Sequence, residues 1–238
     1  MASENQVVTL VADPFPPYQY VKGSQVTGLD YEIIRNAFQS QGLKISVTLH
    51  PWDECIQRVD QGLADGIFQM AKTPEREKRF LFSDLLRIAK TVFFCNKAKP
   101  VTLDSGDSLI EKLQETKTAV VKGYSYGSDF DHLQGICKVS VNSHQESLLE
   151  LSAGKVGLAI MDRGVGVYLI DELKLGDKLQ GVANFEIARP LFVAFQESRL
   201  DIQEIFGRGL EEIRRNGAYD ELMSKYKLKE QQQKKEEN

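Results

Sequence analysis

The chain has 238 residues and a formal net charge of −4, and 42% of its residues are hydrophobic and 27% charged. This is the composition of an ordinary globular protein with enough chain for one large or two modest domains. The acidic balance gives no electrostatic basis for binding nucleic acid or an anionic membrane surface. No apolar run approaches the ~20 residues that a membrane-spanning helix needs.

The N-terminal residues MASENQVVTLVADPF lack the basic segment followed by an apolar segment that is typical of a signal peptide. We therefore expect no signal peptide in this sequence, and the Met-Ala-Ser start is compatible with a chain whose export signal has been removed. The three cysteines, Cys55, Cys95 and Cys137, are far apart and form no CxxC motif, so no metal site is expected. One disulfide is possible from the sequence, and Cys95–Cys137 is the more plausible pair. The cysteines do not decide the redox compartment.

The first 85 residues alternate between strand and helix patterns. Residues Val7 to Ala12 predict a short strand, which breaks at the loop 13–18, where prolines fix the backbone φ. A glycine-bracketed turn follows, and then a helix that Asp30 opens and that ends near Gly42. The next expected elements are a strand at 45–49, a helix at 51–61, a strand at 64–70 and a helix from 74. This order predicts an α/β structure with parallel strands.

The segment from Gly62 to Ser83, GLADGIFQMAKTPEREKRFLFS, predicts a strand that leads into a helix start. Thr73 is a suitable N-cap, and Pro74 suits the first helical position. The first N–H groups of a helix have no intrahelical partner, so they favour an anion. Arg76 lies in this first turn, where the helix dipole disfavours a cation. We interpret Arg76 as a residue that holds a carboxylate, and the alternative is a solvated arginine of the run PEREKR.

From Thr91 onward the same alternation is repeated. Ser143 and Glu146 predict a capping box ahead of an apolar run. The other expected elements are strands at 91–95, 119–121, 139–141, 157–162 and 191–195 and helices at 109–113, after 127, at 164–173, at 202–213 and at 219–226. We expect a discontinuous first lobe of residues 1–89 and 190–228, an inserted second lobe of residues 90–189, and a disordered polar tail at 229–238.

Several segments together resemble one known family. They are PFPPYQY (14–20), GLDYEIIRNAF (28–38), WDECIQRVDQGLADG (52–66), TPERE (73–77) with FLFS (80–83), VVKGYSYG (120–127), GLAIMD (157–162) and NGAYDELMSKYKL (216–228). In this order they resemble the bacterial extracellular solute-binding proteins of family 3, the polar amino acid class of ABC-transporter binding proteins. The resemblance implies a type II periplasmic-binding-protein fold. In this fold two α/β lobes, each a mixed sheet flanked by helices, are joined by two strands and close on a ligand like a Venus flytrap.

The resemblance also implies roles for single residues. Arg76 matches the arginine that clamps the α-carboxylate of the ligand, and Asp162 matches the acidic residue that receives its α-ammonium group. Ser125 matches a hydroxyl residue of the second lobe that touches the carboxylate. The other matched positions are the aromatic walls Phe15 and Trp52 and the strand-end positions Gln69 and Ala71, with Tyr18, Tyr124 and Tyr126 as further candidates for the cleft.

Two positions depart from the family pattern. Ala71 stands where Ser or Thr is common, so one hydroxyl contact to the carboxylate is missing. Ala12 stands where proteins that bind basic amino acids can carry an acidic residue, which argues against lysine or arginine as the ligand. The planar fork of Arg76 suits a carboxylate, and Asp162 at a strand end suits an ammonium group. The site that the resemblance implies is therefore one for a zwitterion.

Structural alternatives stand beside these assignments. Asp162 could cap the helix that follows it, and Trp52 could belong to the core. Phe15 lies between prolines with little core in reach, which favours a functional role. The histidines are interpreted as structural or exposed and three carboxylates as surface or capping groups: His50, His132, His144, Asp53, Glu54 and Asp65.

Three functions are compatible with the sequence. The first is a non-catalytic, monomeric, periplasmic or extracytoplasmic protein that binds a polar or neutral amino acid and delivers it to the membrane permease of an ABC importer, without cofactor or metal. The second is the sensor domain of a membrane receptor such as a histidine kinase, chemoreceptor or cyclase, with KLKEQQQKKEEN as the start of a linker. The third, an enzyme similar to cyclohexadienyl dehydratases, is disfavoured because no histidine falls at the matched cleft positions.

Overall fold

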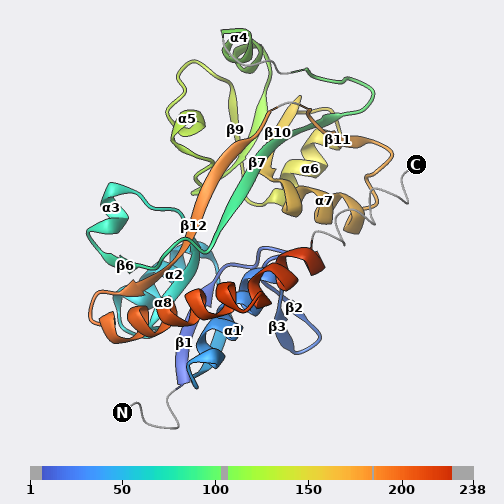
Figure 1. The fold of residues 1–238 in the computed structure, drawn as a ribbon. Helices are drawn as coiled ribbons and strands as arrows, with labels where there is room; N and C mark the ends of the chain where they lie inside the picture. Colours follow the sequence, from blue (N-terminus) through green and yellow to red (C-terminus); the bar gives the residue numbers. More distant parts are fainter. Residues whose placement is uncertain (1–6, 103–106, 184, 227–238) are drawn as a thin grey trace. The chain divides into compact units, whose positions relative to one another are not determined.

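The computed structural model describes residues 7–102, 107–183 and 185–226, and it divides into two compact units (Figure 1). The first unit contains the described residues up to Ile88 and those from Pro190 onward, and the second contains Ala89–Arg189. The chain passes between the units twice, through β7 (Arg87–Asn96) and β12 (Ile187–Gln196). The second unit is thus an insertion into the first.

A mixed sheet forms the centre of the first unit. Its strand β1 (Val7–Ala12) pairs in parallel with β4 (Lys44–Leu49) on one side and β5 (Gly66–Met70) on the other. The parallel arrangement predicted for these three strands is confirmed. β12 adds to β5 in antiparallel direction, and β6 (Phe80–Phe82) pairs with β12. Every residue of β5 is buried, as in a strand covered on both faces.

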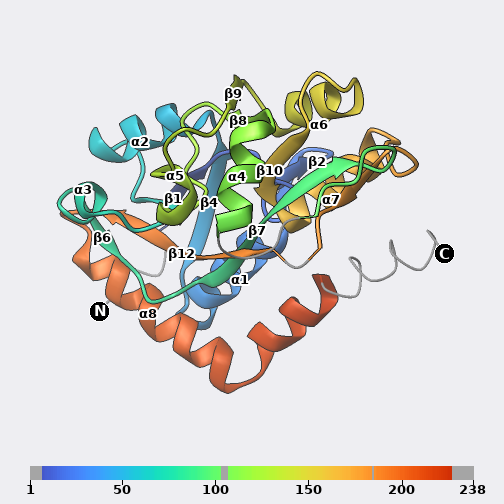
Figure 2. The ribbon, with the colours of Figure 1, turned by 90° about the horizontal axis from the view of Figure 1, so that it is seen from above.

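Helices and one small hairpin complete the first unit. They are the hairpin of β2 (Tyr20–Lys22) and β3 (Gln25–Thr27), the helices α1 (Leu29–Ser40), α2 (Trp52–Asp60), α3 (Pro74–Glu77) and α8 (Leu200–Arg215), and a helical segment at 218–226. Helix α8 runs alongside α1 (Figure 1 and Figure 2). A Cβ atom at Gly209 would lie 2.0 Å from the backbone oxygen of Ala37, so only glycine permits this close approach.

The second unit contains a second mixed sheet with the order β7–β10–β8–β9. Strand β8 (Thr118–Val121) is parallel to both of its neighbours, β9 (Lys138–Val141) and β10 (Leu158–Asp162). Strand β7 is antiparallel to β10 and to β11 (Leu179–Gly181). The helices are α4 (Asp107–Glu115), α5 (Ser128–Asp131), α6 (His144–Ser152) and α7 (Arg163–Glu172).

The predicted helix start at Ser143 is confirmed. The Ser143 side chain accepts a hydrogen bond from the Glu146 backbone N–H at 3.0 Å, and the Glu146 carboxylate accepts one from the Asn142 N–H at 2.7 Å. The helix that Asp30 was expected to open begins instead at Leu29 with Gly28 as its N-cap, and Asp30 lies in the first turn. The predicted polar tail lies outside the described residues.

All three cysteines are free thiols, so the pair Cys95–Cys137 that the sequence left open is not formed. Cys55 and Cys95 are buried and Cys137 is exposed, and burial raises the pKa of the Cys55 thiol to about 12. In the described part of the chain, no helix is long and apolar enough to span a membrane. Within the same residues, no cluster of three or more His, Cys, Asp or Glu side chains could hold a metal ion.

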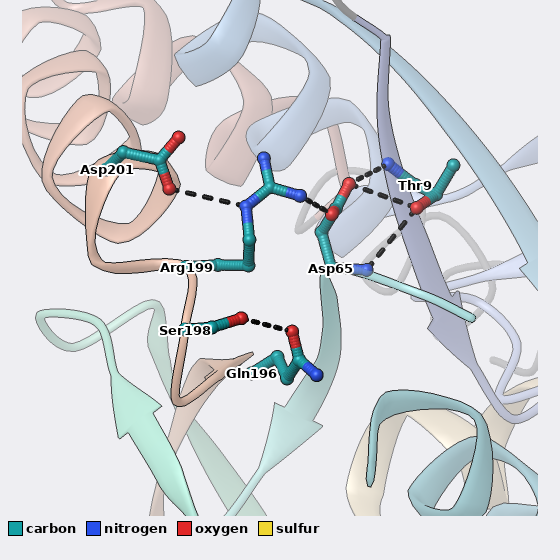
Figure 3. A network of polar contacts seen from close by, with 6 residues as sticks. All are labelled: Thr9, Asp65, Gln196, Ser198, Arg199 and Asp201. Carbon is teal, nitrogen blue, oxygen red and sulfur yellow. Dashed lines mark hydrogen bonds and ion pairs between the residues drawn. The ribbon is translucent and has the colours of Figure 1, made fainter. Parts of the chain in front are cut away.

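Asp65 connects three elements of the first unit at the start of β5 (Figure 3). Its Oδ2 accepts hydrogen bonds from the backbone N–H of Thr9 at 2.7 Å and from the Thr9 hydroxyl at 3.0 Å. Its Oδ1 forms an ion pair with Arg199, which precedes α8. The Asp65 side chain is only 13% exposed. Asp65, expected to be a surface or capping group, is instead a largely buried tie between β1, β5 and α8.

A second ion pair, Asp30–Arg87, is buried completely. The Arg87 Nε donates to the Asp30 Oδ1 at 2.6 Å, and the side chains are 3% and 0% exposed for Arg87 and Asp30. The guanidinium carbon of Arg87 lies 3.6 Å from the ring centroid of Tyr18. The pair therefore joins the first turn of α1 to the start of β7 and holds the proline-containing loop through Tyr18.

Replacing Arg87 with Met should destabilise the first unit strongly, by about 3–5 kcal/mol, because it leaves the Asp30 carboxylate buried without its cation. The double variant Asp30→Leu/Arg87→Met should recover much of that loss, since an apolar pair avoids the cost of burying charge. Urea unfolding measures the free energy of unfolding of both variants. Arg208 is an exposed residue of α8, so Arg208→Met is a matched control. An Arg87→Met loss no larger than that of the control would contradict this account.

Candidate functional site

Arg76 lies in α3, the helix that follows β5 along the chain, and the predicted local structure around it is confirmed. Thr73 is the N-cap of α3 and accepts a hydrogen bond from the Arg76 N–H at 3.3 Å, with Pro74 at the first helical position. The Arg76 Nη1 donates to the backbone oxygen of Ala71 at 3.0 Å, and the guanidinium carbon lies 5.4 Å from the ring centroid of Trp52. These contacts hold the guanidinium in place, so Arg76 is not a freely solvated surface arginine.

The two predicted aromatic walls have different surroundings. Trp52 is the first residue of α2; it is half-buried and packs against the apolar cluster that includes Val11, Cys55 and Ile67. The Phe15 ring is only 2% exposed and is stacked on Tyr18 with 6.0 Å between ring centroids. The expectation that Phe15 has little core in reach is therefore wrong, because the proline-containing loop folds its aromatic rings inward.

Gln69 and Ala71 lie at the end of β5. Gln69 is 7% exposed, and its backbone φ of 64° is in the left-handed region, which is uncommon for a residue other than glycine. Its Oε1 accepts a hydrogen bond from the Nε2 of Gln19 at 2.7 Å. Sequence reasoning did not select Gln19, since the two glutamines are 50 residues apart and no local pattern connects them.

In the second unit, Asp162 is the last residue of β10 and the N-cap of α7. Its Oδ1 accepts hydrogen bonds from the N–H groups of Gly164 at 2.8 Å and Val165 at 3.3 Å, and the residue is 2% exposed. The capping role that stood as the alternative is thus present. It does not exclude a second role, because a carboxylate has two oxygens and about four acceptor positions.

Ser125 belongs to a loop that three polar contacts hold. Its hydroxyl donates to the Oδ2 of Asp131 at 2.6 Å, and the Oδ1 of Asp131 accepts from the Tyr126 N–H at 3.0 Å. The Nη1 of Arg189 donates to the Ser125 backbone oxygen at 2.7 Å. Since a hydroxyl has one proton and an ionised carboxylate only accepts, the Ser125 proton is directed to Asp131. Neither Asp131 nor Arg189 has a sequence signal that would have assigned it to this loop.

The tyrosines on either side of Ser125 are placed differently. Tyr126 is 4% exposed, its hydroxyl accepts from the Val121 N–H at 2.6 Å, and burial raises its pKa above the ordinary value. Tyr124 is half-buried, and its ring meets the His144 ring edge-on at 5.0 Å. His144 is 7% exposed, and burial, with a smaller effect of the nearby Arg189 charge, lowers its pKa to about 3. His144 is thus a buried structural residue.

Comparison with known proteins identifies the family to which this chain belongs. Residues 7–229 match the model of the bacterial extracellular solute-binding proteins, family 3. The chain belongs to this family. The resemblance that its sequence segments carry is therefore confirmed.

Relatives of this chain have names that refer to the binding of amino acids. The chain is 23% identical over 219 residues to the putative ABC transporter arginine-binding protein 2 of Escherichia coli K12, covering 89% of this chain and 86% of that protein. It is 24% identical over 240 residues to the probable histidine-binding protein of Campylobacter jejuni, covering 94% of this chain and 87% of that one. The similarity therefore extends over nearly the full length of both relatives.

Solved structures have the same fold. An ancestral arginine-binding protein bound to arginine matches with a TM-score of 0.80 at 20% identity, covering 94% of this chain and 99% of that one. A histidine kinase sensor domain with similarity to periplasmic binding proteins matches with a TM-score of 0.81 at 21% identity, covering 94% and 96%. At these identities the likeness shows the fold alone, and the predicted type II periplasmic-binding-protein fold is confirmed.

Lowering the pH should destabilise the protein through His144. Its pKa is about 3 when folded and about 6.5 when unfolded, so the unfolded chain binds the proton first. The stability that a neutral His144 contributes is complete above pH 6.5 and is lost as the pH falls toward 3. Unfolding by urea at several pH values should show a slope of up to one proton that His144→Leu removes.

The exposed His132 provides the matched control. His132→Leu should retain the pH dependence of the unmodified protein. If His144→Leu and His132→Leu have the same slope between pH 6 and pH 4, the buried neutral state of His144 is disproved.

Proposed function

We propose that this protein is a non-catalytic, extracytoplasmic binding protein that captures a polar amino acid as a monomer and delivers it to an ABC importer. Family membership over residues 7–229 supports the class of protein. The names of the relatives, which refer to arginine and histidine, support an amino acid as the ligand. Ala12, in place of an acidic residue, favours an uncharged polar side chain over a basic one.

The observation that carries the proposal is the fixed guanidinium of Arg76. It is held against the Ala71 oxygen and the Trp52 ring at the end of β5, where α/β sheets commonly bind ligands. A planar guanidinium in a fixed orientation suits a carboxylate, because two parallel N–H groups can bind its two oxygens. In the proposal Asp162 receives the ammonium group, so the ligand is a zwitterion.

A sensor domain with the same fold is the second candidate, favoured by the similarity to a histidine kinase sensor domain. It would bind an amino acid through the same residues, so ligand binding does not separate it from a transport protein. Reconstitution of the chain with an ABC permease separates the two functions. Stimulation of ATP hydrolysis that depends on the ligand supports import. No stimulation of a functional permease supports sensing.

Arg76→Met should weaken amino acid binding by about a hundredfold or more, since it removes two hydrogen bonds to a charged group. A thermal-shift screen of the standard amino acids identifies the ligand, and calorimetric titration measures its affinity. Arg79→Met, in the same basic run and half-exposed, is the control and should bind as tightly as the unmodified protein. Unchanged affinity in Arg76→Met, or failure of every amino acid in the screen, would reject the proposed clamp.

Asp162→Asn separates capping from ligand binding. Asparagine keeps an oxygen for the N–H groups of Gly164 and Val165, so the melting temperature without ligand should change little. It loses the negative charge, so the affinity should fall about tenfold or more.

The control is Ser143→Ala, which removes the N-cap of α6. It should cost about 1 kcal/mol of stability and leave the affinity unchanged. If Asp162→Asn binds like the unmodified protein, capping is the whole role of Asp162.

A further inference from the structure

We infer that Gln19 is a positioning residue that fixes the Gln69 amide with its NH₂ group toward a carboxylate oxygen of the ligand. The inference rests on the proposed binding of an amino acid. It states the direction of one hydrogen bond to the ligand: Gln69 is the donor. It also assigns a role to Gln19, which orients Gln69 and does not touch the ligand itself.

The orientation of Gln19 follows from its neighbour Asp13. The Gln19 side chain is completely buried, and its Nε2 lies 3.2 Å from the backbone oxygen of Asp13. A carbonyl oxygen can only accept a hydrogen bond, so the atom of Gln19 that faces it must be the nitrogen. Turning the amide over would bring two oxygens together with no proton between them.

The orientation of Gln19 in turn fixes that of Gln69. The second proton of the same Nε2 is donated to the Gln69 Oε1 at 2.7 Å. A reversed Gln69 amide would place NH₂ against NH₂, so the Gln69 oxygen must face Gln19 and its nitrogen must point away. The Gln69 Nε2 is buried and has no hydrogen-bond partner among the described residues. Native proteins rarely bury such a donor, and a ligand acceptor would satisfy it.

The backbone at Gln69 supports a role in binding. Met70 pairs with Phe192 and Phe68 pairs with Val193, so Gln69 is the extra residue of a β-bulge between β5 and β12. Its φ of 64° adds local strain, and strained residues and bulges are found preferentially next to functional sites, where they redirect a side chain. Ala71, two residues further on, binds the Arg76 guanidinium. The Arg76 guanidinium is thus held beside the strand end that carries Gln69.

Two substitutions of Gln69, one apolar and one negatively charged, test whether residue 69 donates a hydrogen bond to the ligand. In Gln69→Met the donor is lost, and the affinity for the amino acid found in the screen should fall about tenfold to a hundredfold. In Gln69→Glu a carboxylate faces the ligand carboxylate, so binding should be weaker still. Tighter binding by Gln69→Glu than by the unmodified protein would overturn the inference, because the ligand group that faces residue 69 would then be a cation and not a carboxylate. Unchanged binding by both variants would overturn it as well.

A double-mutant cycle tests the role of Gln19. Gln19→Met should weaken binding nearly as much as Gln69→Met, and the double variant should bind no more weakly than Gln69→Met alone. Gln57→Met, an exposed residue of α2, is the control and should bind normally. An additional loss in the double variant equal to that of Gln19→Met alone would show that Gln19 acts by another route.

A ligand-free measurement separates this inference from the proposed function. In the ¹⁵N spectrum, both side-chain NH₂ protons of Gln19 should exchange slowly with solvent, and Gln69→Met should accelerate the exchange of one of them. Exchange as fast as that of Gln57 would disprove the fixed amide. If no amino acid binds the unmodified protein, the proposed function and the ligand contact fail together. If an amino acid binds and Gln69→Glu binds as tightly as the unmodified protein, only the inference fails.

Discussion

The first unit depends on one buried ion pair, between Asp30 and Arg87. Burying two charges is costly, and good geometry and further contacts must offset the lost hydration. Here the Arg87 Nε lies 2.6 Å from the Asp30 Oδ1, and the guanidinium also faces the Tyr18 ring. The pair connects the first turn of α1, the start of β7 and the proline-containing loop, which are far apart in the sequence. A substitution that breaks this pair would therefore remove a contact from all three elements.

A chain of contacts connects this pair to Gln69, one of the proposed ligand-binding residues. Tyr18 stacks on Phe15, and the backbone of Phe15 is hydrogen-bonded to that of Gln19 in both directions, at 2.8 Å and 3.1 Å. Gln19 in turn holds the Gln69 amide at the end of β5. The loop that the prolines stiffen is thus a rigid support, in which aromatic packing and two amide hydrogen bonds determine the direction of a single side chain.

Several candidate residues combine a structural role with the proposed one. Asp162 caps α7, Trp52 packs against the core and faces Arg76, and Ser125 is tied to Asp131. Such double use fixes the side chains before a ligand arrives, which reduces the entropy lost on binding. It also explains why the capping interpretation of Asp162 and the ligand interpretation are compatible, since a carboxylate can serve both kinds of donor.

The sequence by itself determined the family, the α/β class and the local structure around Arg76. Those features depend on short-range signals: apolar periodicity, the Thr73–Pro74 helix start and ordered motifs along the chain. Only the tertiary structure decided that Phe15 is buried, that Asp65 binds Arg199 and that Asp30 is paired with Arg87. It alone brought Gln19 to Gln69 and Arg189 to Ser125, which are 50 and 64 residues apart. Such contacts leave no local trace, because a side chain meets a distant partner only after the strands between them have paired.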